Sequence, residues 1–295
     1  MKKYVIAGSI GHISKPIVQQ LEKAGNDVSV ITRSNERVEE IEKLGAKALV
    51  GSVQDAIFVK DALKGADAVY TMIPPIWQTN DWRASQNEVG RNYVDAIRRS
   101  GLQYVVNLSS IGAHVDGIGP ADGLHDLEKM LNAISGLNIK HLRPSYFFNN
   151  LMAQIGLIRQ AGFMGANYGD EREKLLLVHT NDIAAAAAEE LLYLKFTGNS
   201  VRYIVGDERS GKEIAEVLGK AIGKDLEWVL FSDEQQKNGF IQAGVPEVHA
   251  TEYTQMGKAM REGKIQADAR RNKPALSPTK LEDFAQEFAA AFKHS

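Results

Sequence analysis

AGSIGHIS (residues 7–14) decides the fold, because it follows an apolar β-rich run, KKYVIAG, and opens a helical pattern, GHISKPIVQQLEKAG. Gly8 would let the chain turn sharply after the strand. Gly11 would let the backbone approach an anion at the helix N-terminus, where free N–H groups and the helix dipole favour negative charge. Ser14 stands where a dinucleotide-binding turn usually has a third glycine or alanine, and serine is only slightly larger. The stretch predicts a phosphate-binding turn that Ser14 leaves intact; a purely structural turn is the alternative.

Outward from this turn, short β-rich runs alternate with helical patterns as far as Pro144. The predicted strands are KKYVIAG, NDVSVITR, AKALVGS, ADAVYTMI, LQYVVNLSS and NIKHLRP. The predicted helices between them include NERVEEIEKLG, DAIFVKDALKG, SQNEVGRNYVDAIRRSG and HDLEKMLNAISG. Such alternation predicts a parallel sheet covered on both faces. Because crossovers between parallel strands are right-handed, we expect an α/β fold with a doubly wound, Rossmann-like sheet.

Beyond Pro144 the pattern is less regular. SYFFNNLMAQIGLIRQAG has a helical pattern, VRYIVGD and LEWVLFS resemble strands, and most of the remainder is helical. We therefore expect residues 1–150 to form a dinucleotide-binding domain. Residues 151–295 should supply further sheet strands and a small, mostly helical lobe interleaved with that domain. We expect the lobe on the substrate side, over the carboxyl ends of the strands, where such sheets bind ligands.

The composition excludes several classes of function. The chain has 295 residues, 44% hydrophobic and 24% charged, with a net charge of −2 and no cysteine. The absence of cysteine rules out disulfides, thiolate metal sites and a cysteine nucleophile. Near-neutral charge gives no general attraction to nucleic acid or anionic membranes. The first apolar run is too short for a signal peptide, no membrane span is expected, and cytoplasmic is the default location. The histidines lack metal-ligand spacing, so no metal site is predicted.

The end of the second predicted strand points to the cofactor. NAD-binding proteins usually have an acidic residue there, which holds the ribose diol. This chain has Thr32, Arg33 and Ser34 instead, with Arg37 one helical turn further on. A guanidinium offers a planar fork of donors that suits a 2′-phosphate. The sequence thus predicts NADP(H) rather than NAD(H); the alternative is that Arg33 is simply solvated.

Five motifs together carry a resemblance to a known family: GSIGHIS, TRS, VVNLSSIGAH, LRPSYFFNN and VHTNDIAAAA. In this order they resemble the NmrA-like family of atypical short-chain dehydrogenases, and especially its quinone-reductase-like branch. The resemblance covers residues 1–230. It implies a Rossmann-like sheet that binds NADP(H). It also implies one of two roles: an NADPH-dependent reductase of quinones or double bonds, or a sensor that binds the dinucleotide and regulates a transcription factor.

The predicted cofactor residues come from the phosphate turn, the second strand and the resemblance. The turn contributes Gly8, Ser9, Ile10, Gly11, His12 and Ile13. The resemblance implies that Ser52 and Val53 approach the adenine and that Met72, Ile73, Pro74 and Pro75 line the ribose and nicotinamide. It also implies that the nicotinamide face is flanked by Pro144, Ser145, Tyr146 and Phe147, with Asn150 matching an asparagine often found there. Trp77, Trp82, Phe147 and Asn150 are the candidate substrate contacts. Aromatic side chains after the fourth strand suit a flat acceptor, although a core or interface role is the alternative.

The proton-transfer apparatus can be aligned in two ways. Short-chain dehydrogenases typically use Tyr-x-x-x-Lys on one helix face, and no tyrosine here is followed by lysine at that spacing. His125 and Lys129 have that spacing, whereas a His-x-x-Glu alignment joins His125 to Glu128. We take His125 as the candidate acid, with a helix-start histidine of no chemical role as the alternative. Ser110 either donates a hydrogen bond to a substrate carbonyl or caps the next segment.

Three hypotheses about function follow. The first is an NADPH-dependent oxidoreductase that transfers hydride to a small planar acceptor such as a quinone. For such an acceptor the missing Tyr-x-x-x-Lys matters little, because water can supply the proton. The second is a non-catalytic NADP(H) sensor that binds a regulatory protein partner, and the third is an enzyme of the extended dehydrogenase and epimerase type. A homodimer is possible under each.

Overall fold

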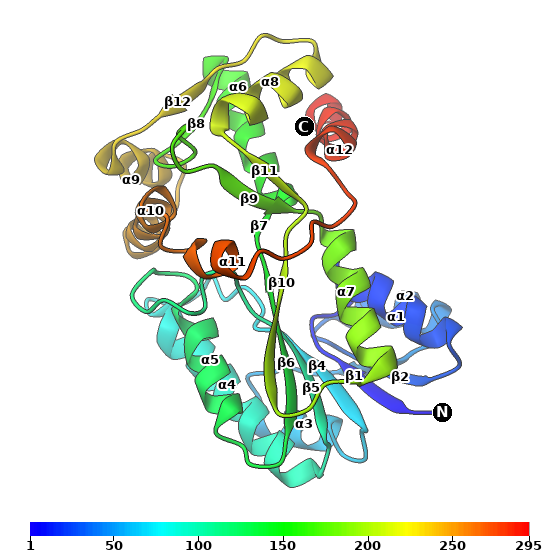
Figure 1. Cartoon of the computed structure of the whole chain (residues 1–295). Coiled ribbons are helices and arrows are strands. Elements are labelled where there is room, and N and C mark those ends of the chain that lie inside the picture. The colour runs from blue at the N-terminus through cyan, green and yellow to red at the C-terminus, as the bar shows by residue number, and fades with distance from the viewer. Residues whose placement is uncertain (295) are drawn as a thin grey trace. The chain divides into compact units, whose positions relative to one another are not determined.

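The computed structural model describes residues 1–294 and divides into two compact units (Figure 1). The first unit comprises Met1–Ala113, Gly123–Arg143 and Ile183–Arg202. The second comprises His114–Asp122, Pro144–Asp182 and the chain from Tyr203 onward. The chain therefore crosses from one unit to the other several times.

The first unit is built on a seven-stranded sheet with the order β10-β6-β5-β4-β1-β2-β3. The bounds of its strands are β1 Lys3–Ile6, β2 Asp27–Thr32, β3 Lys47–Val50, β4 Ala68–Thr71, β5 Tyr104–Leu108, β6 Asn138–Pro144 and β10 Asn199–Ile204. The strands from β3 to β6 pair in parallel. The order reverses direction between β1 and β4, which is the switch point at which Rossmann-type sheets bind their ligands. The predicted doubly wound α/β fold is confirmed.

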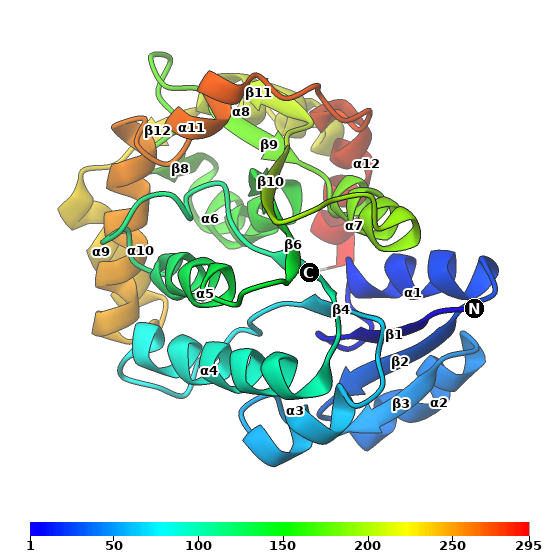
Figure 2. The same ribbon diagram turned by 60° about the horizontal axis from the view of Figure 1, so that its bottom comes forward.

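Helices cover both faces of this sheet. The helices of the first unit are α1 Ser14–Lys23, η1 Asn35–Arg37, α2 Val38–Lys43, α3 Ala56–Ala62, α4 Trp82–Ser100, α5 Asp122–Asn132 and α7 Thr180–Tyr193. A core of buried aliphatic side chains lies between the sheet and α3, α4 and α5. Helices α1 and α7 lie on the opposite face (Figure 2), where the Tyr4 hydroxyl of β1 donates to the Leu191 carbonyl of α7.

Helix α4 begins earlier than its periodicity predicts. The sequence pattern favours a start near Ser85, but the helix begins at Trp82. Asp81 is the reason, because its side chain accepts a hydrogen bond of 2.8 Å from the Ala84 backbone N–H. Such a cap satisfies a free helix donor and adds about 1 kcal/mol of stability.

The second unit combines two small sheets with helices, which confirms the expected helical character of the C-terminal part. Its elements are β7 Tyr146–Phe147, η2 Phe148–Ala153, α6 Gln154–Ala161, β8 Met164–Ala166, β9 Leu175–Val178, β11 Asp207–Arg209, α8 Gly211–Ile222, β12 Trp228–Leu230, α9 Asp233–Gln242, α10 Glu247–Arg261, α11 Ala267–Asn272 and α12 Leu281–His294. The helical prediction for residues 145–162 holds from Phe148 onward but is wrong at its start. The segment starts as β7, because Tyr146 and Phe147 pair with β9, a partner that helical periodicity cannot anticipate.

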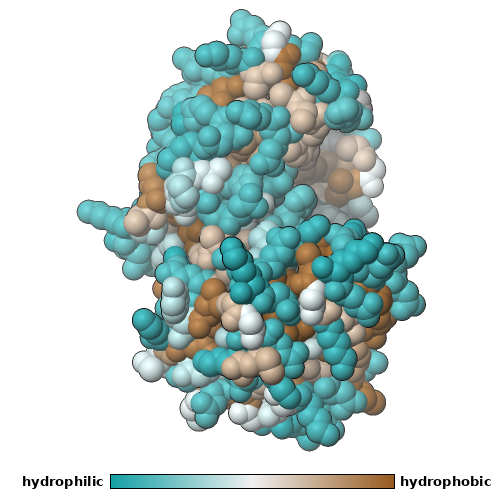
Figure 3. All heavy atoms as spheres, turned by 90° about the vertical axis from the view of Figure 1, so that its right-hand side faces the viewer, coloured by the Kyte–Doolittle hydropathy of each residue, from teal (hydrophilic) through white to brown (hydrophobic). Residues whose placement is uncertain are grey.

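One face of the chain is mixed in polarity. On the face drawn in Figure 3, hydrophilic residues predominate and hydrophobic ones are interspersed among them. Among residues 1–294, no helix combines the length and the apolar character that crossing a bilayer requires.

A buried polar row crosses the middle of the first unit's sheet. Thr71 on β4 donates to the Asn107 Oδ1 atom of β5 at 2.9 Å, and the Asn107 amide lies 3.1 Å from His141 Nδ1 on β6. His141 Nε2 lies 3.0 Å from the Asn132 Oδ1 atom at the end of α5. Since the Asn107 amide donates, His141 accepts at Nδ1 and donates at Nε2, which requires the neutral ring.

This row predicts a loss of stability in acid. Burial lowers the pKa of His141 from its ordinary value of 6.5. The unfolded chain therefore binds a proton more readily than the folded chain. Above pH 6.5 His141 is neutral in both states and its hydrogen bonds contribute fully to stability. As the pH falls from 6.5 through the folded-state pKa of His141, the free energy of unfolding decreases by up to about 1.4 kcal/mol per pH unit. Urea unfolding between pH 5 and 8 measures this.

His141→Gln should flatten that pH dependence, because glutamine accepts and donates without titrating. His12→Gln is the matched control, since His12 is exposed. An unchanged pH slope in His141→Gln would contradict the assignment.

Candidate functional site

The turn after β1 is shaped by close contacts that only glycine permits. Gly8 has a φ of +99°, and a Cβ atom there would lie 2.9 Å from the Met72 side chain. Ser9 also adopts a positive φ, of 57°. Its backbone N–H donates to the Ile31 carbonyl at 2.9 Å, and its hydroxyl donates to Thr32 Oγ1 at 3.1 Å. The turn is thus held against the end of β2.

The start of α1 is open on its outer side. A Cβ atom on Gly11 would meet nothing within 4 Å. Within residues 1–294, the backbone N–H groups of Gly11, His12 and Ile13 donate no hydrogen bond, and α1 has no side-chain cap. Ser14 is buried and donates to the Ala7 carbonyl, so its hydroxyl is directed back at the strand. Free N–H groups at a helix start are the donors that bind an anion.

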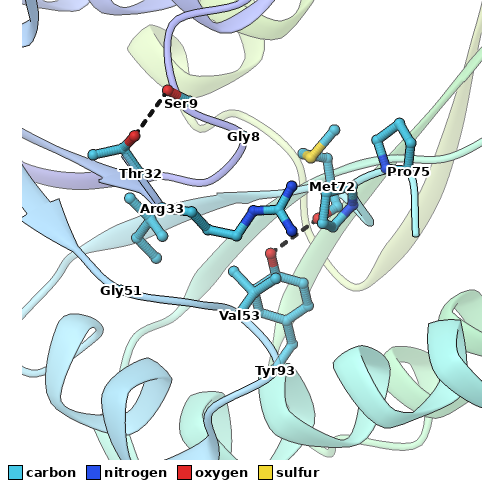
Figure 4. Close-up of a pocket in the computed structure, with 11 residues that line it drawn as sticks. Gly8, Ser9, Thr32, Arg33, Gly51, Val53, Met72, Pro75 and Tyr93 are labelled. Atoms are coloured by element: carbon cyan, nitrogen blue, oxygen red, sulfur yellow. Dashed lines mark hydrogen bonds between the residues drawn. The ribbon is translucent and has the colours of Figure 1, made fainter. Parts of the chain in front are cut away.

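A cavity of about 220 Å³ extends from this turn along the carboxyl ends of β2 and β4 (Figure 4). Eight of the predicted residues line it: Gly8, Ser9, Thr32, Arg33, Val53, Met72, Pro74 and Pro75. Three further lining residues were not predicted: Ile31, Gly51 and Tyr93. The lining is mainly apolar, as suits an aromatic base, with Arg33 as its charged member.

Of the lining residues that sequence reasoning missed, Tyr93 gave no local signal. It comes from the middle of α4, and its hydroxyl donates to the Met72 carbonyl at 2.9 Å. Burial raises the pKa of Tyr93, so the phenol stays protonated as a donor. Gly51 did carry a signal, since it follows β3 directly. A Cβ atom there would lie 2.4 Å from the Phe58 ring.

The two arginines after β2 are in different states. Arg33 is exposed, and its side chain extends along the cavity toward Met72 and Tyr93 (Figure 4). No hydrogen bond or ion pair engages its guanidinium within residues 1–294. Arg37 is instead paired with Glu40 at 2.8 Å. Arg33 is thus the guanidinium available to a ligand.

The remaining predicted cofactor residues do not line the cavity. In the first unit these are Ile10, Gly11, His12, Ile13, Ser34, Arg37, Ser52 and Ile73. Both serines cap short turns: Ser34 Oγ accepts from the Glu36 N–H and Ser52 Oγ accepts from the Gln54 N–H, each at 3.2 Å.

Pro144, Ser145, Tyr146, Phe147 and Asn150 belong to the second unit. Tyr146 lies with its hydroxyl 3.0 Å from that of Tyr168. Ser145 Oγ is buried and has no hydrogen-bond partner in the described chain. Phe147 is half-buried and Asn150 is exposed.

The neighbouring phenylalanine, Phe148, belongs to the core. It is fully buried and stacks on Phe284 with ring centroids 5.5 Å apart. Phe148 therefore contributes to the packing of the second unit.

His125 is oriented by a backbone carbonyl. It lies on α5, is 9% exposed, and its Nδ1 atom is 2.8 Å from the Ala113 carbonyl. A carbonyl only accepts, so Nδ1 carries the hydrogen and the tautomer is fixed. Its Nε2 atom is buried and has no partner among residues 1–294. Lys129, one turn further on, is exposed.

Glu128, three residues beyond His125, is engaged in the core. It accepts from Arg143 at 2.6 and 3.0 Å, and also from the Ser109 hydroxyl. The pKa of Glu128 is lowered although burial opposes this; the guanidinium of Arg143 is the main cause. Glu128 thus fixes α5 against the ends of β5 and β6.

Helix α5 is also held by α4. Asp126 accepts from Arg83 at 2.7 and 2.8 Å and from Asn87 at 2.8 Å. The Arg83 guanidinium is the main cause that lowers the pKa of Asp126 to about 2. The helix that bears His125 is therefore anchored on two sides.

Ser110 is engaged with its own backbone. Its hydroxyl accepts from the Gly112 N–H at 3.2 Å, and its carbonyl accepts from the Ala113 N–H at 3.0 Å. This is the capping role left open from the sequence, and it shapes the loop whose Ala113 carbonyl orients His125.

The two tryptophans after β4 differ in exposure. Trp77 is 59% exposed, whereas Trp82 is 6% exposed and donates from Nε1 to the Ile76 carbonyl at 2.6 Å. Their rings meet edge to face at 5.6 Å. Trp82 therefore supports Trp77, which alone of the pair presents its ring to solvent.

The comparisons with known proteins identify a family for this chain. The model of the NmrA-like family matches residues 1–285. The chain is 23% identical over 244 residues to an NAD(P)H azoreductase of Xenophilus azovorans, covering 82% of each chain.

Two solved structures share its fold. An NADPH-dependent quinone oxidoreductase of Escherichia coli, solved with NADPH, has a TM-score of 0.82 at 20% identity over 96% of this chain and 99% of that one. NmrA, a negative transcriptional regulator solved with NAD, has a TM-score of 0.75 at 16% identity over 99% of this chain and 97% of that one. The motifs, the sheet and the family match agree, and the chain belongs to the NmrA-like family.

Proposed function

We propose that this chain binds NADP(H) in the first unit and acts as an NADPH-dependent oxidoreductase on a small planar acceptor such as a quinone. Support comes from the open phosphate turn, from the adjoining cavity, and from the activities named for the azoreductase and the quinone oxidoreductase that it resembles.

The described residues fit such a dinucleotide. The free N–H groups of Gly11, His12 and Ile13 would hold the diphosphate. The apolar lining around Val53 and Tyr93 would hold the adenine side. When bound, NADPH supplies a hydride from its nicotinamide ring.

The main support for the proposal is the guanidinium of Arg33, which is unpaired in the described part of the chain. An arginine at the end of β2 lines the cavity without an internal partner, and no acidic residue replaces it. A guanidinium binds a phosphate through two parallel charge-assisted hydrogen bonds, whereas it would gain little from a ribose hydroxyl.

Arg33→Ala tests the proposal directly. We expect NADP(H) affinity to fall about 10- to 100-fold, the loss of a charge-assisted pair. NAD(H) affinity should change by less than about twofold, because the 2′-hydroxyl is neutral. Calorimetric titration of wild type and variant with both cofactors measures this. Arg98→Ala is the matched control, since Arg98 is an exposed arginine in the last turn of α4 and does not line the cavity. Equal losses for both cofactors would contradict the proposal.

For the acceptor, the proposal assigns roles to Trp77 and His125. The exposed Trp77 ring, two residues beyond the cavity residue Pro75, offers a surface on which a flat acceptor can stack. Reduction of a quinone to a hydroquinone takes one hydride and one proton. His125 Nε2, when protonated, would donate that proton, and water is the alternative source.

A dinucleotide sensor is the second candidate. It is favoured by the similarity to the regulator NmrA and by the exposure of Lys129, which leaves the dehydrogenase-type pair incomplete. Purified protein that binds NADP(H) yet oxidises no NADPH across a panel of quinones and azo dyes would favour the sensor. Steady NADPH oxidation would favour the reductase.

A further inference from the structure

One carboxylate on α2 joins two cations beside the phosphate turn. Glu40 Oε1 lies 2.9 Å from the Lys15 ammonium, and Glu40 Oε2 lies 2.8 Å from the Arg37 guanidinium. Lys15 is the second residue of α1, directly after the turn, and Arg37 ends η1, four residues beyond Arg33. Glu40 thus links the start of α1 to the segment that carries Arg33.

The three cations in this region are held differently. Arg33 has no internal partner in the described chain, whereas Lys15 and Arg37 share the single charge of Glu40. The side chains of Lys15, Arg37 and Glu40 are 37% to 54% exposed. Their ion pairs are therefore hydrated, and another anion can replace Glu40 in them. Both cations bind to Glu40, and Lys15 contributes most to lowering the pKa of this carboxyl, which keeps it ionised at neutral pH.

We infer that Glu40 is a specificity-determining residue, an internal carboxylate that competes with the cofactor's 2′-phosphate for Lys15 and Arg37 and so limits the preference for NADP(H). This inference rests on the proposed function. A phosphate dianion near Arg33 would attract both cations but must displace Glu40 and approach its negative charge. NAD(H) has a neutral hydroxyl at this position, so Glu40 does not affect its binding.

Glu40→Gln tests this directly. We expect the Kd for NADP(H) to fall about threefold to tenfold, because exposed ion pairs are weak and two of them are released. The Kd for NAD(H) should stay within about twofold. The gain for NADP(H) should shrink in 0.5 M salt, since screening weakens interactions between exposed charges.

Glu39→Gln is the matched control. It removes the same charge from the same helix, but Glu39 is paired with Lys43. We expect its ratio of NADP(H) to NAD(H) affinity to equal that of wild type. Adding Lys15→Gln and Arg37→Gln to Glu40→Gln should abolish the gain.

Three outcomes separate the two proposals. A wild type with no saturable binding of either dinucleotide overturns the proposed function and this inference together. A wild type that prefers NADP(H), with an affinity ratio unchanged by Glu40→Gln or changed equally by Glu39→Gln, overturns only the role of Glu40. An increased ratio in Glu40→Gln alone supports it.

Discussion

Glu128→Ala will lower the free energy of unfolding by about 3–5 kcal/mol, the cost of breaking a buried ion pair from one side. Glu128 is 5% exposed and Arg143 is 8% exposed, so the guanidinium would lose its carboxylate in a place that water does not readily reach. Ser109 would lose its acceptor as well. Chemical denaturation and thermal unfolding both measure the loss, with a melting temperature lower by roughly 10 °C.

Asp126→Ala is the control for this prediction. Asp126 lies on the same helix and is paired with Arg83, whose side chain is 41% exposed. A partly exposed pair contributes about 0–1 kcal/mol, so this variant should lose far less stability. Glu128→Ala combined with Arg143→Met should recover part of the loss, because it removes the buried charge that has lost its carboxylate. Equal destabilisation by Glu128→Ala and Asp126→Ala would show that burial of the pair is not the cause.

His125→Ala will slow turnover of the proposed acceptor by about 100-fold, the lower end of what a positioned proton donor contributes. The reason is the fixed tautomer, which leaves Nε2 as the ring nitrogen without a hydrogen-bond partner in the described chain. NADPH affinity should be unchanged, since the cofactor cavity does not include His125. Single-turnover oxidation of NADPH measures the rate, and titration measures the affinity.

Lys129→Ala is the control for His125. Lys129 is exposed and lies one helical turn from His125. We expect the Lys129→Ala variant to oxidise NADPH at the wild-type rate. If His125→Ala turns over at the wild-type rate, or loses no more than Lys129→Ala, then water supplies the proton and His125 has only a structural role.

The sheet could be predicted because its signals are local. Alternation of β-rich runs with helical patterns reflects side-chain direction within each segment, and right-handed crossovers leave few ways to connect them. The segment after Pro144 could not be predicted in the same way. Its first residues form β7 only because β9, about 30 residues later, supplies the pairing partner.

Some residues of the candidate site could be predicted from local sequence, and others could not. Gly8 and Arg33 stand at strand ends, where sequence position alone indicates a ligand-binding role. Tyr93 enters the cavity from the middle of a helix, and Trp82 is buried at the start of the same helix with its indole N–H bonded to the Ile76 carbonyl. Neither position could be predicted from the neighbouring residues, because each depends on packing between separate segments of the chain.

The buried row of Thr71, Asn107 and His141 has a consequence for how the strands find their alignment. Asn107 is the direct cross-strand neighbour of both Thr71 and His141. A slip of one residue would turn a polar side chain to the opposite face and leave its partners unsatisfied in an apolar interior. Aliphatic side chains alone would tolerate several such alignments at similar energy. The row therefore favours the native strand register, because a register shift at the centre of the sheet would leave buried polar groups without hydrogen-bond partners.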